Sequence, residues 1–190
     1  MDTLKQNQVL AAVMLILCAT SVQAEDWRTL RGPHFDGSAS LNDAAIATGA
    51  LKLKTVWKQP FGSGYSGASI AGDRLVSAMA DKEANQEFLV AKSVETGETL
   101  WRSATGKIMV GENGSFDGPI ATPAIDEERA YHLSPHGNLA AYDIATGGVV
   151  WAHDLKSEYG AEPNFYGFGA CPILHAGLLI VPVGAPDAMA

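Results

Sequence analysis

The sequence has few cysteines, few basic residues and no apolar run long enough to cross a membrane. Its two cysteines are Cys18 and Cys171, and its 13 basic residues are outnumbered by 21 acidic ones, for a formal charge of −8. An acidic chain is a poor partner for nucleic acid. The apolar stretch from Val9 to Thr20 is shorter than the roughly 20 residues of a membrane span. We therefore expect neither a nucleic-acid partner nor a transmembrane segment in the mature chain.

The first 24 residues are typical of a secretory signal. Lys5 lies in a polar opening, an apolar core follows, and Ser21 to Ala24 ends in the small residues that signal peptidase accepts. We predict cleavage near Ala24 and a periplasmic or secreted location. Only Cys171 would then survive, so no internal disulfide could form. Lipidation at Cys18 is the alternative, although the bulky Leu17 stands where that processing needs a small residue.

Helical periodicity is also missing. After the signal, no window longer than ten residues keeps apolar positions at helical spacing. Instead, 20 glycines and 9 prolines are spread along the chain, as turns between many short strands require. The composition therefore predicts an all-β protein.

One hairpin pattern occurs twice, 50 residues apart. Residues 91–101 and 141–151 share Ala-x-(Ser or Asp)-x-x-Thr-Gly-x-x-x-Trp, which predicts two strands around a glycine turn and a terminal tryptophan. Trp57 precedes Trp101 by 44 residues and lies in an alternating stretch, Lys54 to Lys58, that we expect to be a strand. A single small sheet cannot bury its own faces, so each tryptophan should dock against a neighbouring copy.

A second pattern of short strand, polar turn and apolar strand recurs between the tryptophans. The unit from Pro123 to Trp151 predicts four strands, at 124–125, 130–134, 139–143 and 149–153. Four-stranded units repeating every 44 to 50 residues are typical of β-propeller blades. A β-helix would need a shorter period, and a β-sandwich gives no reason for equal spacing.

We predict three parts: a signal at 1–24, an aromatic-rich arm and lead-in at 25–53, and antiparallel four-stranded propeller blades at 54–190. At this repeat length the chain holds about three to three and a half blades, fewer than most propellers have. We expect the N-terminal portion of a longer protein. A ring completed by a second copy is the alternative.

The hairpin pattern resembles the tryptophan-docking repeat of the pyrroloquinoline-quinone (PQQ)-like β-propellers. That family includes quinoprotein alcohol dehydrogenases and an outer-membrane assembly lipoprotein, and the stretch from Trp27 to Gly37 resembles its exported, non-dehydrogenase branch. In the dehydrogenases the quinone lies between a tryptophan and a disulfide of two adjacent cysteines, beside a Ca²⁺ ion held by Glu and Asn. This sequence has no adjacent cysteines, and Asp117, Glu162 and Asn164 do not match the motif. We therefore expect no cofactor.

Propeller ligands bind at the mouth of the central channel, where the segment leading into each blade's first strand opens. Those segments, at 62–67, 114–119 and 164–169, each combine glycine with an aromatic residue. They predict a site for a protein or a small ligand, lined by Tyr65, Phe116, Asp117, Tyr166 and Phe168. The alternative is that these aromatics only fill the tapering wall.

The sequence predicts no catalytic residue and no metal site. His132 and His136 flank a turn, and neither these two nor His153 and His175 have a carboxylate or cysteine at ligand spacing. Ser66 follows Gly64 but Ala68 replaces the second glycine of a nucleophile elbow.

We therefore favour an exported, non-catalytic propeller that acts as a binding or interaction scaffold. The alternative is an oxidoreductase that uses PQQ and Ca²⁺ and whose catalytic residues lie beyond residue 190. A third hypothesis, an assembly factor at the outer membrane, would require lipidation at Cys18.

Overall fold

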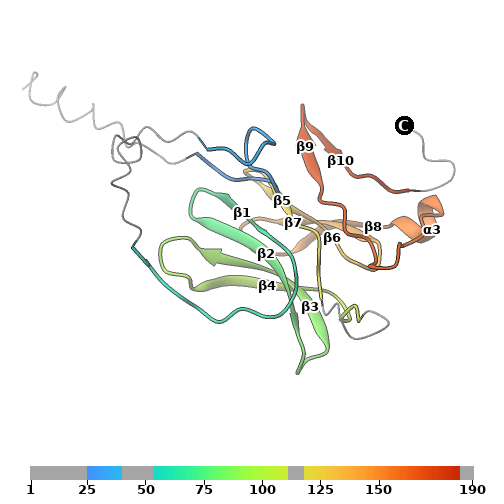
Figure 1. The fold of residues 1–190 in the computed structure, drawn as a ribbon, viewed down its shortest axis with the longest axis horizontal. Coiled ribbons are helices and arrows are strands. Elements are labelled where there is room, and N and C mark those ends of the chain that lie inside the picture. Colours follow the sequence, from blue (N-terminus) through green and yellow to red (C-terminus); the bar gives the residue numbers. More distant parts are fainter. Residues whose placement is uncertain (1–24, 40–53, 111–117, 185–190) are drawn as a thin grey trace, which may run out of the picture.

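The computed structural model describes residues 25–39, 54–110 and 118–184 (Figure 1). Several predictions fall outside the described residues: the signal with Cys18 and Ala24, the lead-in from 40 to 53, and the candidates Phe116 and Asp117. Within the described ranges, no helix is long and apolar enough to cross a membrane.

The first antiparallel sheet consists of β1 (Ala68–Ala71), β2 (Arg74–Asp81), β3 (Gln86–Ser93) and β4 (Thr99–Gly106). Each strand pairs with the next one in the chain, so the sheet is a simple meander. The turn after β2 includes Asn85, whose φ of 49° lies in the left-handed region that asparagine tolerates better than most residues.

The second sheet repeats this meander with β5 (Ala124–Ile125), β6 (Arg129–Leu133), β7 (Asn138–Asp143) and β8 (Val149–Asp154). The four predicted strands of this unit are confirmed, each to within one residue at either end. Two sheets of four antiparallel strands in the same order confirm the predicted blade architecture.

A third unit begins after α3 (Leu155–Tyr159), a short helix that Asp154 caps and that ends at Gly160. Its hairpin consists of β9 (Ile173–His175) and β10 (Leu178–Ile180). β5 contacts both β1 and β9, so the first strands of the three units are neighbours in sequence order. Figure 1 shows the β9–β10 hairpin projecting beside β5.

A core of buried residues fills the space between the first two sheets. Val76, Ala91 and Trp101 align across β2, β3 and β4 and contribute to it, because alternate residues of a strand point to the same face. Trp101 is 7% exposed and its Nε1–H donates to the Ile144 carbonyl at 2.9 Å. A Cβ on Gly147 would lie 2.6 Å from the Trp101 ring, so glycine lets the indole pack on the turn. The predicted docking of Trp101 is confirmed.

A second core lies between the second sheet, α3 and the third unit. Its buried members are Ala121, Leu133, Leu139, Leu155, Ala161 and Phe168. Trp151 lies at the edge of this core and is only partly buried. The centroid of its ring system lies 6.1 Å from that of the Tyr131 ring and 5.4 Å from that of the His153 ring. Trp151 was expected to dock between two four-stranded sheets. It does not, because the described part of the third unit is a two-stranded hairpin.

The predicted strand from Lys54 to Lys58 is wrong, since these residues form no strand. An alternating stretch forms a strand only where the edge of a sheet is free to pair with its backbone. Strands β1 to β4 already form the first sheet without residues 54–58. Trp57 nevertheless docks as predicted. Its Nε1–H donates to the Val94 carbonyl at 2.6 Å, and Gly97 lies against its ring as Gly147 lies against Trp101.

Candidate functional site

The segments that lead into β1, β5 and β9 lie side by side and form one surface. The Tyr65 N–H donates to the Pro119 carbonyl at 2.8 Å, and the Gly67 N–H donates to Thr122 Oγ1 at 3.0 Å. The Thr122 N–H in turn donates to Cys171 Sγ at 3.2 Å. These contacts fix relative to one another the three segments that the sequence predicts to line a channel mouth.

Glycine permits the closest of these approaches. A Cβ on Gly67 would lie 2.7 Å from Thr122 Oγ1, closer than a Cβ atom comes to such a neighbour in real structures. Gly64 has a φ of 138°, which L-residues with a side chain rarely adopt, and it packs on Pro119. Gly64 and Gly67 therefore let this segment approach the neighbouring segment, at Pro119 and Thr122, closely.

A pocket of about 490 Å³ opens on this surface, and we call it the mouth pocket. Its lining residues are Tyr65, Ile120, Asn164, Tyr166, Gly167, Gly169 and Ala170. Tyr65 is 59% exposed and Tyr166 is 47% exposed, so much of each aromatic ring is accessible to a ligand. The pocket volume falls within the roughly 300–1,000 Å³ of small-molecule sites.

A tight turn presents the third side of the mouth pocket. Asn164 Oδ1 accepts a hydrogen bond from the Tyr166 N–H at 2.9 Å, and the Asn164 carbonyl accepts one from the Gly167 N–H at 2.9 Å. The rings of Phe165 and Tyr166 meet edge to face with centroids 5.0 Å apart. This Asx turn fixes the backbone that carries Tyr166.

Of the five predicted mouth residues, the structure brings Tyr65 and Tyr166 together in one pocket. Phe168 lies elsewhere: it is 7% exposed, belongs to the second core and packs on Gly137. Gly167, between Tyr166 and Phe168, has a φ of 82° and turns the chain, so the Phe168 side chain points into the second core while Tyr166 faces the pocket. The sequence did not predict Ile120 and Ala170 as lining residues. The available signal was Pro119 before Ile120 and Gly169 before Ala170.

A buried carboxyl group supports the backbone beside the mouth. Glu87 on β3 is fully buried, and its Oε1 accepts a hydrogen bond from the Met109 N–H at 2.9 Å. Burial raises the pKa of Glu87 above its ordinary value. The Met109 carbonyl accepts from the Gly118 N–H at 3.1 Å, which links Glu87 to the start of the segment that holds Pro119.

Side chains that could hold a metal ion do not gather in the described residues. The mouth pocket has no carboxylate, histidine or cysteine among its lining residues. Across the described ranges, no group of three or more His, Cys, Asp and Glu could hold a metal ion. Cys171 is a free thiol. The described residues therefore supply no ligand set for a Ca²⁺ ion.

The four histidines singled out in the sequence have separate surroundings. His132 is fully buried in the second sheet, and burial lowers its pKa to about 4. His136 Nε2 lies 2.9 Å from the Lys107 carbonyl, and His153 Nδ1 lies 2.7 Å from Glu158 Oε2. His175 is the last residue of β9.

The N-terminal arm, residues 25–39, packs on the first strands of the blades. Trp27 and Ile70 exchange two backbone hydrogen bonds, of 2.8 and 2.7 Å, and the Arg28 carbonyl accepts from the Ile125 N–H. The arm thus joins β1 to β5.

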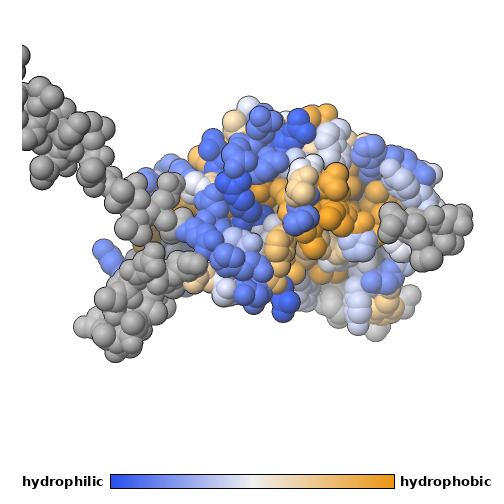
Figure 2. Space-filling view, turned by 90° about the horizontal axis from the view of Figure 1, so that it is seen from above, coloured by the Kyte–Doolittle hydropathy of each residue, from blue (hydrophilic) through white to orange (hydrophobic). Residues whose placement is uncertain are grey.

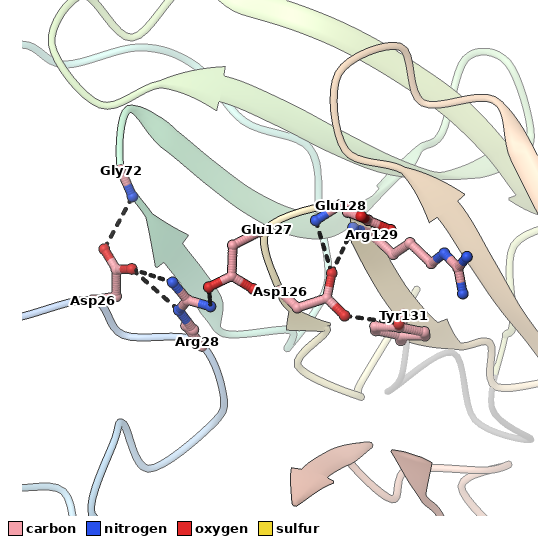
Figure 3. A network of polar contacts seen from close by, with 8 residues as sticks. All are labelled: Asp26, Arg28, Gly72, Asp126, Glu127, Glu128, Arg129 and Tyr131. Carbon is pink, nitrogen blue, oxygen red and sulfur yellow. Dashed lines mark hydrogen bonds and ion pairs between the residues drawn. The ribbon is translucent and has the colours of Figure 1, made fainter. Parts of the chain in front are cut away.

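Charged groups at the same place reinforce the arm (Figure 3). Arg28 pairs with Asp26 at 2.8 Å and with Glu127 at 2.6 Å, and Asp26 Oδ1 accepts from the Gly72 N–H at 3.0 Å. The hydrogen bond from Arg28 lowers the pKa of Glu127. The network fixes the arm to turns of both sheets.

Comparison with known proteins finds a matching family profile and a sequence relative. A family profile described as "Outer membrane protein assembly factor BamB" matches residues 85–181. Methanol dehydrogenase (cytochrome c) subunit 1 from Methylobacterium organophilum is 33% identical over 81 residues, which are 42% of this chain and 13% of that protein.

The fold of this chain is similar to parts of two solved structures. Quinohemoprotein alcohol dehydrogenase from Comamonas testosteroni has a TM-score of 0.58 at 16% identity, and the match covers 87% of this chain and 24% of that one. A europium-containing methanol dehydrogenase has a TM-score of 0.58 at 13% identity, with 86% of this chain and 28% of that one covered. This chain therefore spans 13 to 28% of the length of these relatives.

Proposed function

Because the chain belongs to the family of PQQ-like repeat β-propellers, we propose that it is a non-catalytic binding scaffold that works outside the cytoplasm. Support for the location comes from the predicted signal at 1–24 and from the description of the family profile as an outer membrane protein assembly factor. The likeness to dehydrogenases is compatible with the same fold in a protein without catalysis, since a fold hosts unrelated functions.

The chemistry of the mouth pocket is the observation that carries this proposal. Its polar groups in the described residues are the hydroxyls of Tyr65 and Tyr166, the Asn164 amide and backbone groups. General acid–base catalysis uses a side chain whose pKa lies near the working pH, most often histidine or a carboxyl group. The pocket instead offers aromatic rings and neutral hydrogen-bonding groups, which suit binding.

We propose an extended segment of another protein as the ligand. Tyrosine supplies a large contact area at low cost in conformational entropy, which is why it is enriched where proteins bind one another. Tyr65 and Tyr166 come from different blade units, so a bound segment would cross from one unit to another.

Peptide binding to paired variants tests this function. Peptides selected from a random library on the full chain should bind Tyr65→Ala and Tyr166→Ala about ten-fold more weakly, since truncating an interface aromatic costs about 1–2 kcal/mol. Tyr159→Ala is the matched control, because Tyr159 is 51% exposed and belongs to α3 rather than to the mouth pocket. Equal binding by all three variants would refute the proposal.

A second candidate function is a PQQ-dependent oxidoreductase, favoured by the 33% identity to a methanol dehydrogenase subunit over 81 residues. Its catalytic groups would have to lie outside the described residues. Titration of the full-length protein with PQQ and Ca²⁺ separates the two functions. Saturable quenching of tryptophan fluorescence together with dye-linked alcohol oxidation would establish the oxidoreductase, whereas neither signal is expected for a scaffold.

A further inference from the structure

A second cavity, distinct from the mouth pocket in most of its lining, lies under the N-terminal arm, and we call it the arm cavity. It measures about 390 Å³ and its lining residues are Thr29, Leu30, Arg31, Phe35, Gly169, Ala170, Cys171, Pro172, Ile173 and Pro182. In Figure 1 the arm lies beside β5 and β9. We propose that the arm cavity binds a small amphipathic carboxylate, an acyl chain or aromatic ring that ends in a carboxyl group.

The arm forms a fixed roof over this cavity. Thr29 is buried and its Oγ1 donates to the Gly32 carbonyl at 3.3 Å. A Cβ on Gly32 would lie 2.7 Å from the Trp27 ring, so the turn is packed directly under the indole. Together with the ion pairs of Arg28, these contacts give the cavity a wall that exists before any ligand binds.

Phe35 is held in a conformation that a phenylalanine rarely adopts. Its φ is 57°, in the left-handed region, and its side chain is 41% exposed. The residue lines the arm cavity and also an adjacent cavity of about 310 Å³ that includes Ile125 and Leu174. Backbone strain of this kind persists where the surroundings enforce it, and it is concentrated at binding sites.

The apolar lining sets the class of the ligand body. Leu30 and Ile173 lie on the arm and on β9, and both are exposed although they are aliphatic. Covering them with an apolar group removes their side chains from water, which favours binding. In Figure 2 apolar surface gathers over the β9–β10 hairpin, whose exposed residues include Leu178 and Ile180. A longer acyl chain could continue along that surface.

Arg31 sets the charge of the ligand. Its side chain has no hydrogen bond or ion pair with any residue in the described ranges, whereas Arg28, three positions earlier, is paired with two carboxylates. A guanidinium presents a planar fork of donors that matches a carboxylate. An unpaired guanidinium beside an apolar cavity therefore complements an apolar molecule with an anionic end.

Cys171 provides a reporter within the cavity. The chain has two cysteines, so a Cys18→Ser background leaves the Cys171 thiol as the single target for Ellman's reagent. Decanoate should protect this thiol in a saturable way. Decanol should protect it about five-fold more weakly, because a surface ion pair is worth up to about 1 kcal/mol, and decyltrimethylammonium more weakly still.

Three variants make the test specific. Arg31→Gln should abolish the preference for decanoate over decanol, while Lys58→Gln, which removes an exposed charge outside the cavity lining, should preserve it. Phe35→Gly relieves the strained φ while removing the ring, so protection should fall although the melting temperature does not. No protection by decanoate, an unchanged preference in Arg31→Gln, or full protection in a folded Phe35→Gly variant would each overturn the proposal.

Discussion

Trp101 and Trp151 end the same repeat pattern in consecutive blades, yet their surroundings differ. Trp101 is buried between two sheets with its indole N–H bound to the Ile144 carbonyl, whereas Trp151 is partly buried beside Tyr131 and His153. Trp57 makes the Trp101 type of contact even though no strand surrounds it. Docking therefore depends on the hairpin that receives the indole, which supplies a carbonyl and a glycine, more than on the strand that carries it.

Replacing these tryptophans should give the largest difference. Trp101→Ala should lower the free energy of unfolding by about 3–5 kcal/mol, since it leaves a cavity between two sheets. Trp151→Ala should cost less, because that side chain is already partly exposed. Urea denaturation of the full chain measures both, with Trp101→Phe as the control that keeps a ring but loses the N–H. Equal losses at positions 101 and 151 would contradict the comparison.

The receiving glycine gives the next largest effect. Gly147→Ala should destabilise by about 2–4 kcal/mol, because the left-handed φ of 74° disfavours alanine and its Cβ would lie 2.6 Å from Trp101. Gly177→Ala is the matched control, with a φ of 77° and open space around its Cβ. It should cost about 1–2 kcal/mol, the backbone cost alone. Thermal or urea melts measure the loss of unfolding free energy. An equal loss in both variants would show that the contact between residue 147 and the Trp101 indole does not affect stability.

The two blades also differ at one core position. Counted from Arg74 and Arg129, Ser77 of the first blade corresponds to His132 of the second. Ser77 Oγ donates to the Gly67 carbonyl at 2.9 Å, whereas neither ring nitrogen of His132 has a partner among the described residues. Burial lowers the pKa of His132 to about 4, so the folded chain keeps this imidazole neutral.

Stability should therefore depend on pH through His132. Between pH 6.5 and 4 the unfolded chain binds a proton at this residue and the folded chain does not, so stability falls as the pH falls through that window. The loss amounts to up to about 3 kcal/mol. His132→Leu removes this contribution, and its unfolding free energy should vary less with pH from 6.5 to 4. An identical pH profile in urea melts of both proteins would show that His132 is not buried as a neutral group.

The two blades differ least at their hairpin turns, where different side chains accept the hydrogen bonds of the turn. In the second blade Asp143 Oδ1 accepts from the N–H groups of Ala145 and Thr146. In the first blade serine replaces that aspartate. Ser93 Oγ accepts from the Thr96 N–H at 3.2 Å, and Asp73 from the neighbouring turn accepts from Ser93 Oγ and from the Glu95 N–H.

Ser93→Ala should cost about 1–2 kcal/mol, the net worth of the two hydrogen bonds that the Ser93 hydroxyl makes. Asp73→Ala should remove one of these two bonds, so the double variant should be less destabilised than the sum of the two single variants. Thermal melts of the three proteins measure the coupling. Strict additivity would mean that Asp73 does not substitute for the missing aspartate.

The repeat pattern predicted the blades well because its information is local to each hairpin. Alternation placed the strands from Ala124 to Asp154, and the Thr-Gly turns located the sites that receive Trp57 and Trp101. The same alternation misplaced a strand at 54–58, since a pattern does not reveal whether a partner edge is free.

The site was predicted only in part, because its geometry is not local. Tyr65 and Tyr166, predicted from their glycine-flanked segments, line one pocket. Phe168 lies in the core instead, since the direction of a side chain along an irregular segment depends on the turn at Gly167. The arm cavity had no signal in the sequence. It arises only when residues 29–35 lie against 169–173, far away in the chain.

Hydrogen exchange of the indole N–H groups tests most directly the claim that a receiving hairpin fixes each tryptophan. In ¹⁵N-labelled protein the indole protons of Trp57 and Trp101 should exchange slowly, because both are bound to a buried or half-buried carbonyl, while that of Trp151 should exchange quickly. Exchange of the Trp101 indole as fast as that of Trp151 would contradict the account.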